Sequence, residues 1–145
     1  QDTVWVGAPL RAHRRCDEPM FSISNAVAYD GLMVFGTPPR SEFTHARRSV
    51  WLDIRSGHTD GKWVPAEGTS LQNTVTMLLD RGLAAEEIFV VSPFRQVANE
   101  ARKILKTQIP ADRVGTVHTT QGKESDVVIM ILGTHPDASG SQLGH

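Results

Sequence analysis

Apolar residues recur along the chain at two kinds of spacing, and each kind predicts a different element. Spacings of three and four residues predict three helices. Their apolar faces are formed by Met20, Ile23, Val27 and Ala28, by Leu71, Val75, Leu78 and Leu79, and by Val97, Ala98, Ala101, Ile104 and Leu105. Short apolar runs predict strands at residues 3–7, 32–35, 50–54, 88–91, 113–118 and 126–132.

Residues that favour helix ends support this reading. Asp17 is a predicted N-cap with Pro19 in the first turn, and Ser92 is a predicted N-cap with Pro93 at the first helical position. Gly82 stands where a helix over about residues 67–81 needs a left-handed C-cap.

The alternation of strands and helices predicts the fold class. Strands that are almost continuously apolar are typical of a parallel α/β sheet covered on both faces. Ligands of such sheets bind where the strands end. Polar clusters follow three of the predicted strands, at residues 14–16, 92–95 and 118–124. We therefore expect these clusters to meet along one edge of the sheet.

Length and composition narrow the functional classes. At 145 residues the chain is long enough for one ordinary domain. Fifteen basic and 16 acidic residues give a net charge of −1, so any nucleic-acid surface must be local. The single cysteine, Cys16, suits a reducing cytosol, and the longest apolar run, 127–132, is too short to span a membrane. We expect a cytoplasmic protein without a membrane partner, and a fragment of a longer chain because no initiator Met is present.

The triplet Gly122-Lys123-Glu124 suggests a phosphate-binding loop but does not fit one. Such a loop requires G-x-x-x-x-G-K-[ST], whereas Glu124 follows the lysine and Val117 stands at the first glycine position. The other Gly-Lys pair is followed by Trp63. Lys123 could still neutralise a phosphate, and Glu124 could accept a hydrogen bond from a sugar hydroxyl. A solvated turn is the alternative.

A compact cation cluster contains Arg11, His13, Arg14 and Arg15. Arginine forks match phosphate oxygens, and an arginine placed at a transferring phosphoryl group acts as an arginine finger. A solvated basic turn is the alternative. His13 and Cys16 have ligand-like spacing, but no second ligand pair accompanies them, so we expect no metal site.

The segment Ser92-Pro93-Phe94-Arg95 begins a predicted helix. Free backbone N–H groups and the helix dipole attract anions at such an end. The Phe94 ring could stack on a nucleobase. The alternative is that Phe94 belongs to the core and Arg95 is merely exposed to solvent.

Taken in order, three segments resemble a known family. They are "LRAHRRCDEPMFSISNAVAYDG", "FVVSPFRQVANEARKIL" and "VGTVHTTQGKESDVVIMIL", and the resemblance spans about positions 10–133. They resemble the second RecA-like domain of superfamily 1 helicases, in the branch of the nonsense-mediated decay helicase and the replication nuclease-helicase. The resemblance implies a RecA-like three-layer α/β sandwich with a mostly parallel sheet, a P-loop NTPase-type fold that lacks its own P-loop.

The resemblance also implies roles for individual residues. Arg15 matches the catalytic arginine that reaches the γ-phosphate of ATP, which is bound with Mg²⁺ mainly by the first RecA-like domain. Gly122, Lys123 and Glu124 match positions that face the nucleotide, with Glu124 near the ribose. The positions that match contacts to a single strand are Ser92, Pro93, Phe94, Arg95, Thr116, His118, Thr119 and Gln121.

The implied function is ATP-driven translocation along single-stranded nucleic acid, with DNA favoured over RNA. The implied partner is the first RecA-like domain of the same chain, which carries the Walker A loop and the Mg-binding Asp-Glu pair. The motif VI arginine is also missing here, so we expect the fragment alone to be inactive. Arg14 stands where the family often has an aromatic residue, which argues against base stacking at that point. A non-catalytic nucleic-acid-binding or scaffold module that retains the RecA-like fold is the alternative.

Overall fold

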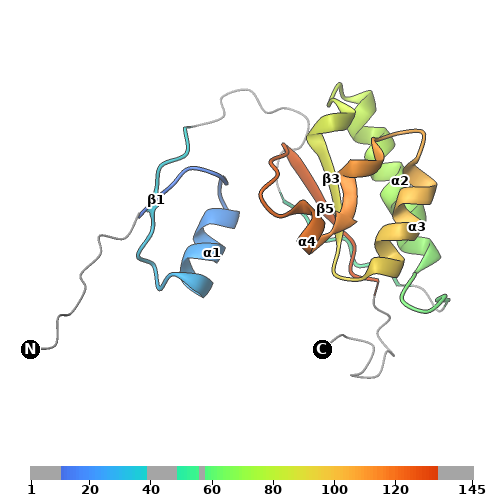
Figure 1. The fold of residues 1–145 in the computed structure, drawn as a ribbon, viewed down its shortest axis with the longest axis horizontal. Helices are drawn as coiled ribbons and strands as arrows, with labels where there is room; N and C mark the ends of the chain where they lie inside the picture. Colours follow the sequence, from blue (N-terminus) through green and yellow to red (C-terminus); the bar gives the residue numbers. More distant parts are fainter. Residues whose placement is uncertain (1–10, 39–48, 56–57, 134–145) are drawn as a thin grey trace, which may run out of the picture. The chain divides into compact units, whose positions relative to one another are not determined.

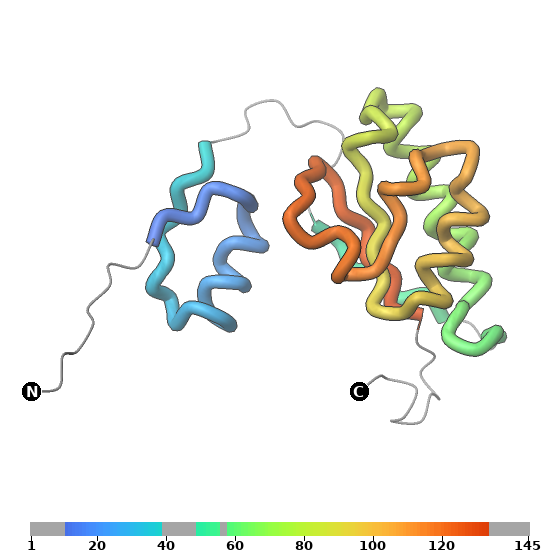
Figure 2. The backbone as a smooth tube through the Cα atoms, viewed as in Figure 1, coloured from blue at the N-terminus to red at the C-terminus, as the bar shows by residue number. Residues whose placement is uncertain are grey.

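The computed structural model describes residues 11–38, 49–55 and 58–133. The chain divides into two compact units, Gln1–Phe43 and Thr44–His145, which are drawn in Figures 1 and 2. The strand expected at residues 3–7 lies outside the described residues, and the expectation of one domain over the whole chain stays a prediction.

The described residues of the first unit, 11–38, form two short parallel strands and one helix. Strand β1 (Ala12–His13) pairs with β2 (Val34–Phe35), with His13 opposite Phe35. Helix α1 (Met20–Ala28) connects them. The buried Phe21 ring lies between the rings of His13 and Phe35, with centroid distances of 5.6 and 5.1 Å. This aromatic contact holds the helix against the strands.

Helix α1 forms where the sequence predicts it, but two details of the prediction were wrong. The N-cap is Pro19 instead of Asp17, and the Glu18 carboxylate accepts hydrogen bonds from the backbone N–H and hydroxyl of Ser22. The expected inner face is exposed at Met20, Ile23 and Val27. Two strands of two residues each offer too little surface to cover it.

In the second unit, the residues that the structure describes form a parallel three-stranded sheet in the order β4-β3-β5. Its strands are β3 (Ile88–Ser92), β4 (Val114–Thr116) and β5 (Val127–Met130). Its helices are α2 (Pro65–Asp80), α3 (Arg95–Leu105) and α4 (Val117–Thr120), with 3-10 turns at Ala85–Glu87 and Ala111–Arg113. Figure 1 shows α2 and α3 side by side on one side of the strands and α4 on the other. The α/β class with a parallel sheet is confirmed.

The core of this unit lies between β3 and the two longer helices. All five residues of β3 are buried, as expected for a central strand. Helix α3 buries Val97, Ala98, Ala101 and Leu105, which confirms its predicted inner face except for the half-buried Ile104. Gly82 follows α2 with φ +88°, and its N–H donates to Leu79 O at 2.8 Å, as predicted for a left-handed helix end.

Three strand predictions in this unit were wrong in extent or burial. Val128 and Met130 of β5 are 56% and 60% exposed, because successive side chains point to opposite faces of a strand and the described residues cover mainly the face that carries Val127 and Ile129. The predicted strand at 113–118 ends at Thr116, where α4 takes over. Residues 50–54 form no strand, and Trp51 is exposed. Among the described residues, no helix is both long and apolar enough to cross a membrane.

Candidate functional site

Two of the candidate strand-binding segments lie side by side. β3 and β4 are parallel, and Ser92 at the end of one is directly opposite Thr116 at the end of the other. The residues that follow, 93–95 and 117–119, therefore leave the sheet at the same edge. The sequence prediction that these two clusters meet where their strands end is confirmed.

Ser92 and its neighbours differ in part from the prediction. Ser92 is the last residue of β3 and only 1% exposed, and its Oγ accepts a hydrogen bond from the Phe94 N–H at 3.2 Å. Helix α3 begins at Arg95 with Phe94 at its N-cap, so Ser92 as the cap and Pro93 as the first helical residue were wrong. Ser92 thus shapes the turn, while Pro93 and Arg95 are exposed.

The Phe94 ring is half-buried and has a cationic partner. Lys62 Nζ lies 3.7 Å from the ring centroid. Neither alternative from the sequence, a ring open for base stacking or a ring in the core, describes this arrangement. Sequence patterns do not reveal the role of Lys62, because Gly61-Lys62 fits no phosphate-binding loop and its contact joins residues 32 positions apart in the chain.

Residues 117–120 form the short helix α4 instead of a loop, with Thr116 and Gln121 at its two ends. The Thr116 carbonyl accepts hydrogen bonds from the hydroxyls of Thr119 at 2.9 Å and Thr120 at 3.3 Å. Gly115 packs so closely that an added Cβ would meet Thr119. His118 and Gln121, like Thr119, are exposed. The segment therefore presents polar side chains beside the end of β4.

The triplet Gly122-Lys123-Glu124 lies toward the opposite edge of the sheet. Ser125 Oγ donates to Glu87 O at 2.6 Å, just before β3, and Arg113, just before β4, donates to Glu124 O at 3.3 Å. Lys123 Nζ donates to Asp112 O at 3.4 Å. The expectation of a single edge was wrong for this triplet. Because β5 is parallel to β3, the chain must return to the beginning of the sheet before Val127 can pair with Ile88.

Arg15 is exposed in the first unit, two residues after β1. The turn around it is held by Cys16, whose Sγ lies 2.9 Å from His13 Nε2 and whose carbonyl accepts a hydrogen bond from Thr37 Oγ1 at 3.1 Å. Burial, with smaller contributions from the charges of Asp17 and Glu18, raises the pKa of the Cys16 thiol. The thiol is thus kept protonated, which disfavours metal binding or nucleophilic attack by Cys16.

The candidate side chains suit parts of a nucleotide and do not form a complete site for one. Lys123 and Arg15 carry charges that suit phosphate oxygens, and the exposed Glu124 suits a hydroxyl. Within residues 11–38, 49–55 and 58–133, no three His, Cys, Asp or Glu side chains come together as ligands for a metal ion.

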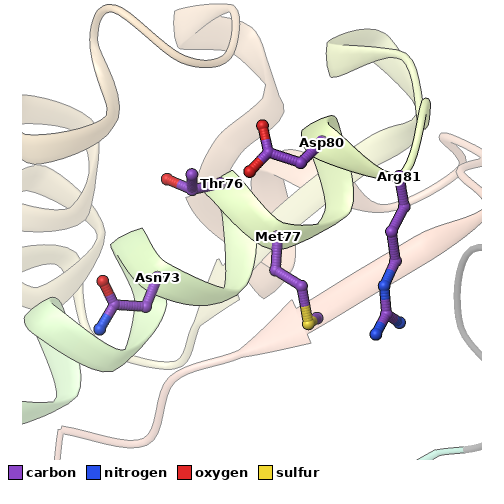
Figure 3. A pocket seen from close by; sticks show the side chains of 5 residues that line it. All are labelled: Asn73, Thr76, Met77, Asp80 and Arg81. Carbon is purple, nitrogen blue, oxygen red and sulfur yellow. The ribbon is translucent and has the colours of Figure 1, made fainter.

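A shallow hollow of about 370 Å³ lies on the exposed side of α2. Figure 3 shows its lining side chains, with Met77 and Arg81 pointing the same way and Asp80 pointing away from them. Asn73 and Thr76 complete the lining. All five come from α2 and its C-terminal cap, so the hollow is separate from every candidate residue.

Comparison with known proteins identifies the family. A family model described as an AAA domain matches residues 9–139. Neither the curated proteins nor the solved structures contain a match to this chain. Because the family match covers nearly the whole sequence, the chain belongs to this AAA domain family, which is associated with the C-terminal region of superfamily 1 helicases, and it is a nucleotide-binding, helicase-type domain.

Proposed function

We propose that the chain is the second RecA-like motor domain of an ATP-dependent superfamily 1 helicase or translocase, in the branch of the nonsense-mediated decay helicase and the replication nuclease-helicase. One observation supports this most directly: the parallel register of β3 and β4 sets residues 92–95 beside residues 116–119. Exposed Arg95, His118 and Thr119 side chains then lie along one edge of the sheet. Such an edge can follow a sugar-phosphate backbone without reading its sequence.

The nucleotide-facing residues of the proposal lie at the other edge of the same sheet. Lys123 and Glu124 contact residues that precede β4, whereas Thr116 ends that strand. β3 runs between the two edges and is buried at every position. A packed strand of this kind moves as a rigid element. A displacement of residues 122–124 would therefore be transmitted to the strand-binding edge.

ATP with Mg²⁺, held mainly by a first RecA-like domain elsewhere in the parent protein, would supply the phosphoryl group whose hydrolysis drives movement. In this chain, Lys123 and Glu124 would orient the nucleotide. The exposed Arg15 guanidinium would stabilise the charge that develops on the phosphoryl oxygens.

The test is Arg15→Ala in a parent protein that contains both RecA-like domains. ATP hydrolysis stimulated by single-stranded nucleic acid is expected to fall by roughly 10³–10⁵-fold, as when an arginine finger is lost. Strand binding should persist, because the proposed strand contacts lie in the other unit. Arg11→Ala, an exposed arginine just before β1, is the matched control and should keep its activity.

Normal turnover by the Arg15 variant would refute the catalytic assignment. A parent protein that binds strands but has neither a Walker A loop nor ATPase activity would instead identify a non-catalytic binding module.

A further inference from the structure

Lys62 and Phe94 form a cation–aromatic pair at the edge where β3 ends. Lys62 Nζ lies 3.7 Å from the ring centroid of Phe94, which follows the last residue of β3 by two positions. We propose that Lys62 is a further phosphate-binding residue for the single strand, seated on Phe94 and positioned by Gln96. The inference rests on the proposed function, since it adds a contact to the same strand-binding edge.

The loop that carries Lys62 is held in a defined shape. Asp60 and Trp63 exchange two backbone hydrogen bonds of 2.8 and 2.9 Å, and Gly61 between them has φ +58°. Trp63 is buried and anchors the end of the loop. The backbone of Lys62 is therefore fixed before any ligand arrives.

Gln96, in the first turn of α3, joins this loop to the helix. Its Oε1 accepts a hydrogen bond from the Lys62 N–H at 3.1 Å, and its Nε2 donates to Asp60 O at 2.8 Å. The fit is close, because a Cβ on Gly61 would stand 2.7 Å from Gln96 Oε1. Since Gln96 uses both ends of its amide on the loop, it is a positioning residue and does not need to touch the strand itself.

The pair favours phosphate over a base as the ligand. The ammonium occupies one face of the half-buried Phe94 ring, so a base could stack on that face only after displacing the cation. A lysine ammonium directs three donors from a compact charge, and it can turn some of them toward a phosphate while it rests on the ring. The Phe94 ring then positions the lysine ammonium and is not the stacking platform that the sequence suggests.

The experiment measures the binding of the 145-residue chain to fluorescein-labelled oligo(dT) and oligo(U) of equal length at several salt concentrations. Each phosphate contact contributes about 0.7 to the slope of log affinity against log salt for single strands. Lys62→Gln is expected to reduce that slope by about 0.7 and to weaken binding on the order of tenfold at 50 mM salt. Lys103→Gln, an exposed lysine later in α3, is the control and should keep the wild-type slope.

Phe94→Leu and the double variant Lys62→Gln/Phe94→Leu test whether the Phe94 ring positions the lysine. The effect of Lys62→Gln should be smaller when Phe94 is already Leu, because the two residues act as one unit. Additive effects, or a loss of affinity in Phe94→Leu with an unchanged salt slope, would indicate base stacking and overturn the proposal. Gln96→Ala should reproduce part of the Lys62 effect.

Failure of this inference differs from failure of the proposed function. A salt-dependent wild type whose slope is unchanged by Lys62→Gln overturns only the role of Lys62. A wild type that binds neither oligonucleotide contradicts the strand-binding edge itself. Far-UV circular dichroism of each variant confirms that the fold is retained.

Discussion

The Glu67 side chain lies in the first turn of α2 and is only partly exposed. Its Oε2 accepts a hydrogen bond from the Gly133 N–H at 3.0 Å, just past the end of β5. Burial raises the pKa of this carboxyl above its ordinary 4.5, and the Gly133 hydrogen bond opposes part of that rise. The ionised form is thus less favourable in the folded chain than in the unfolded one.

Glu67→Gln should remove a pH-dependent loss of stability. Between pH 4.5 and the raised folded pKa, the native state binds more protons at Glu67 than the unfolded state does, so the free energy of unfolding falls as pH rises. The glutamine carbonyl can keep the Gly133 contact without the charge. Urea unfolding from pH 4 to 8 should show that the advantage of the variant over wild type grows across this window and then levels off. Glu86→Gln, at an exposed position, is the control. A constant difference at every pH would contradict the prediction.

Among the elements, the beginning of α2 and the loop before it depend on the contact between Trp63 and Gly68. Gly68 is buried, and an added Cβ would meet the Trp63 ring. Alanine is a better helix former than glycine by about 1 kcal/mol, which alone would stabilise α2. Overpacking in a fitted core costs about 1–3 kcal/mol. We expect the clash to dominate because Trp63 is itself buried.

Gly68→Ala should therefore lower the free energy of unfolding by up to about 2 kcal/mol, the difference between these two effects. Thermal unfolding followed by tryptophan fluorescence would measure this change. Thr69→Ala, at the next and exposed position, changes helix propensity without this contact and should not destabilise the protein. A stabilised Gly68 variant would mean that the indole can move aside freely.

Local chemistry predicted the elements well where it alone decided them. Gly82, with its left-handed turn, and the apolar face of α3 follow from spacing and residue type. Ser92 failed as a cap because pairing with Thr116 extends β3 by one residue and uses Ser92 in the sheet. Local spacing cannot register such a pairing.

The candidate site was predictable only in part for a similar reason. The neighbouring ends of β3 and β4 follow from a parallel sheet. Lys123 lies at the other edge because the chain returns to the beginning of the sheet before β5. Predicting that return requires the register of β5 against β3. The contact of Lys62 with Phe94 depends on a loop fixed by Gln96, whose amide could make such bonds at many places.

At the scale of the whole molecule, the two units differ in how much apolar surface they bury. In the unit Thr44–His145, Val75, Ile88, Val97, Ala101 and Leu105 are completely buried. Among the described residues of Gln1–Phe43, Phe21 is the buried apolar side chain, whereas Val27, Leu32 and Val34 are exposed. Hydrophobic stabilisation is roughly proportional to buried apolar area, so it is concentrated in the second unit.

A fragment of residues 44–145 should therefore unfold cooperatively on its own. Differential scanning calorimetry is expected to show one transition, and the hydrogen bonds between β3, β4 and β5 should protect their amides from exchange. The matching fragment of residues 1–43 should show no transition, because chains of about 40 residues rarely fold without disulfides, metals or partners. Loss of the transition in residues 44–145 would mean that the buried residues of this unit do not suffice to hold its sheet. The same fragment should still bind oligo(dT) with salt dependence, since residues 92–95, residues 116–119 and Lys62 all belong to it.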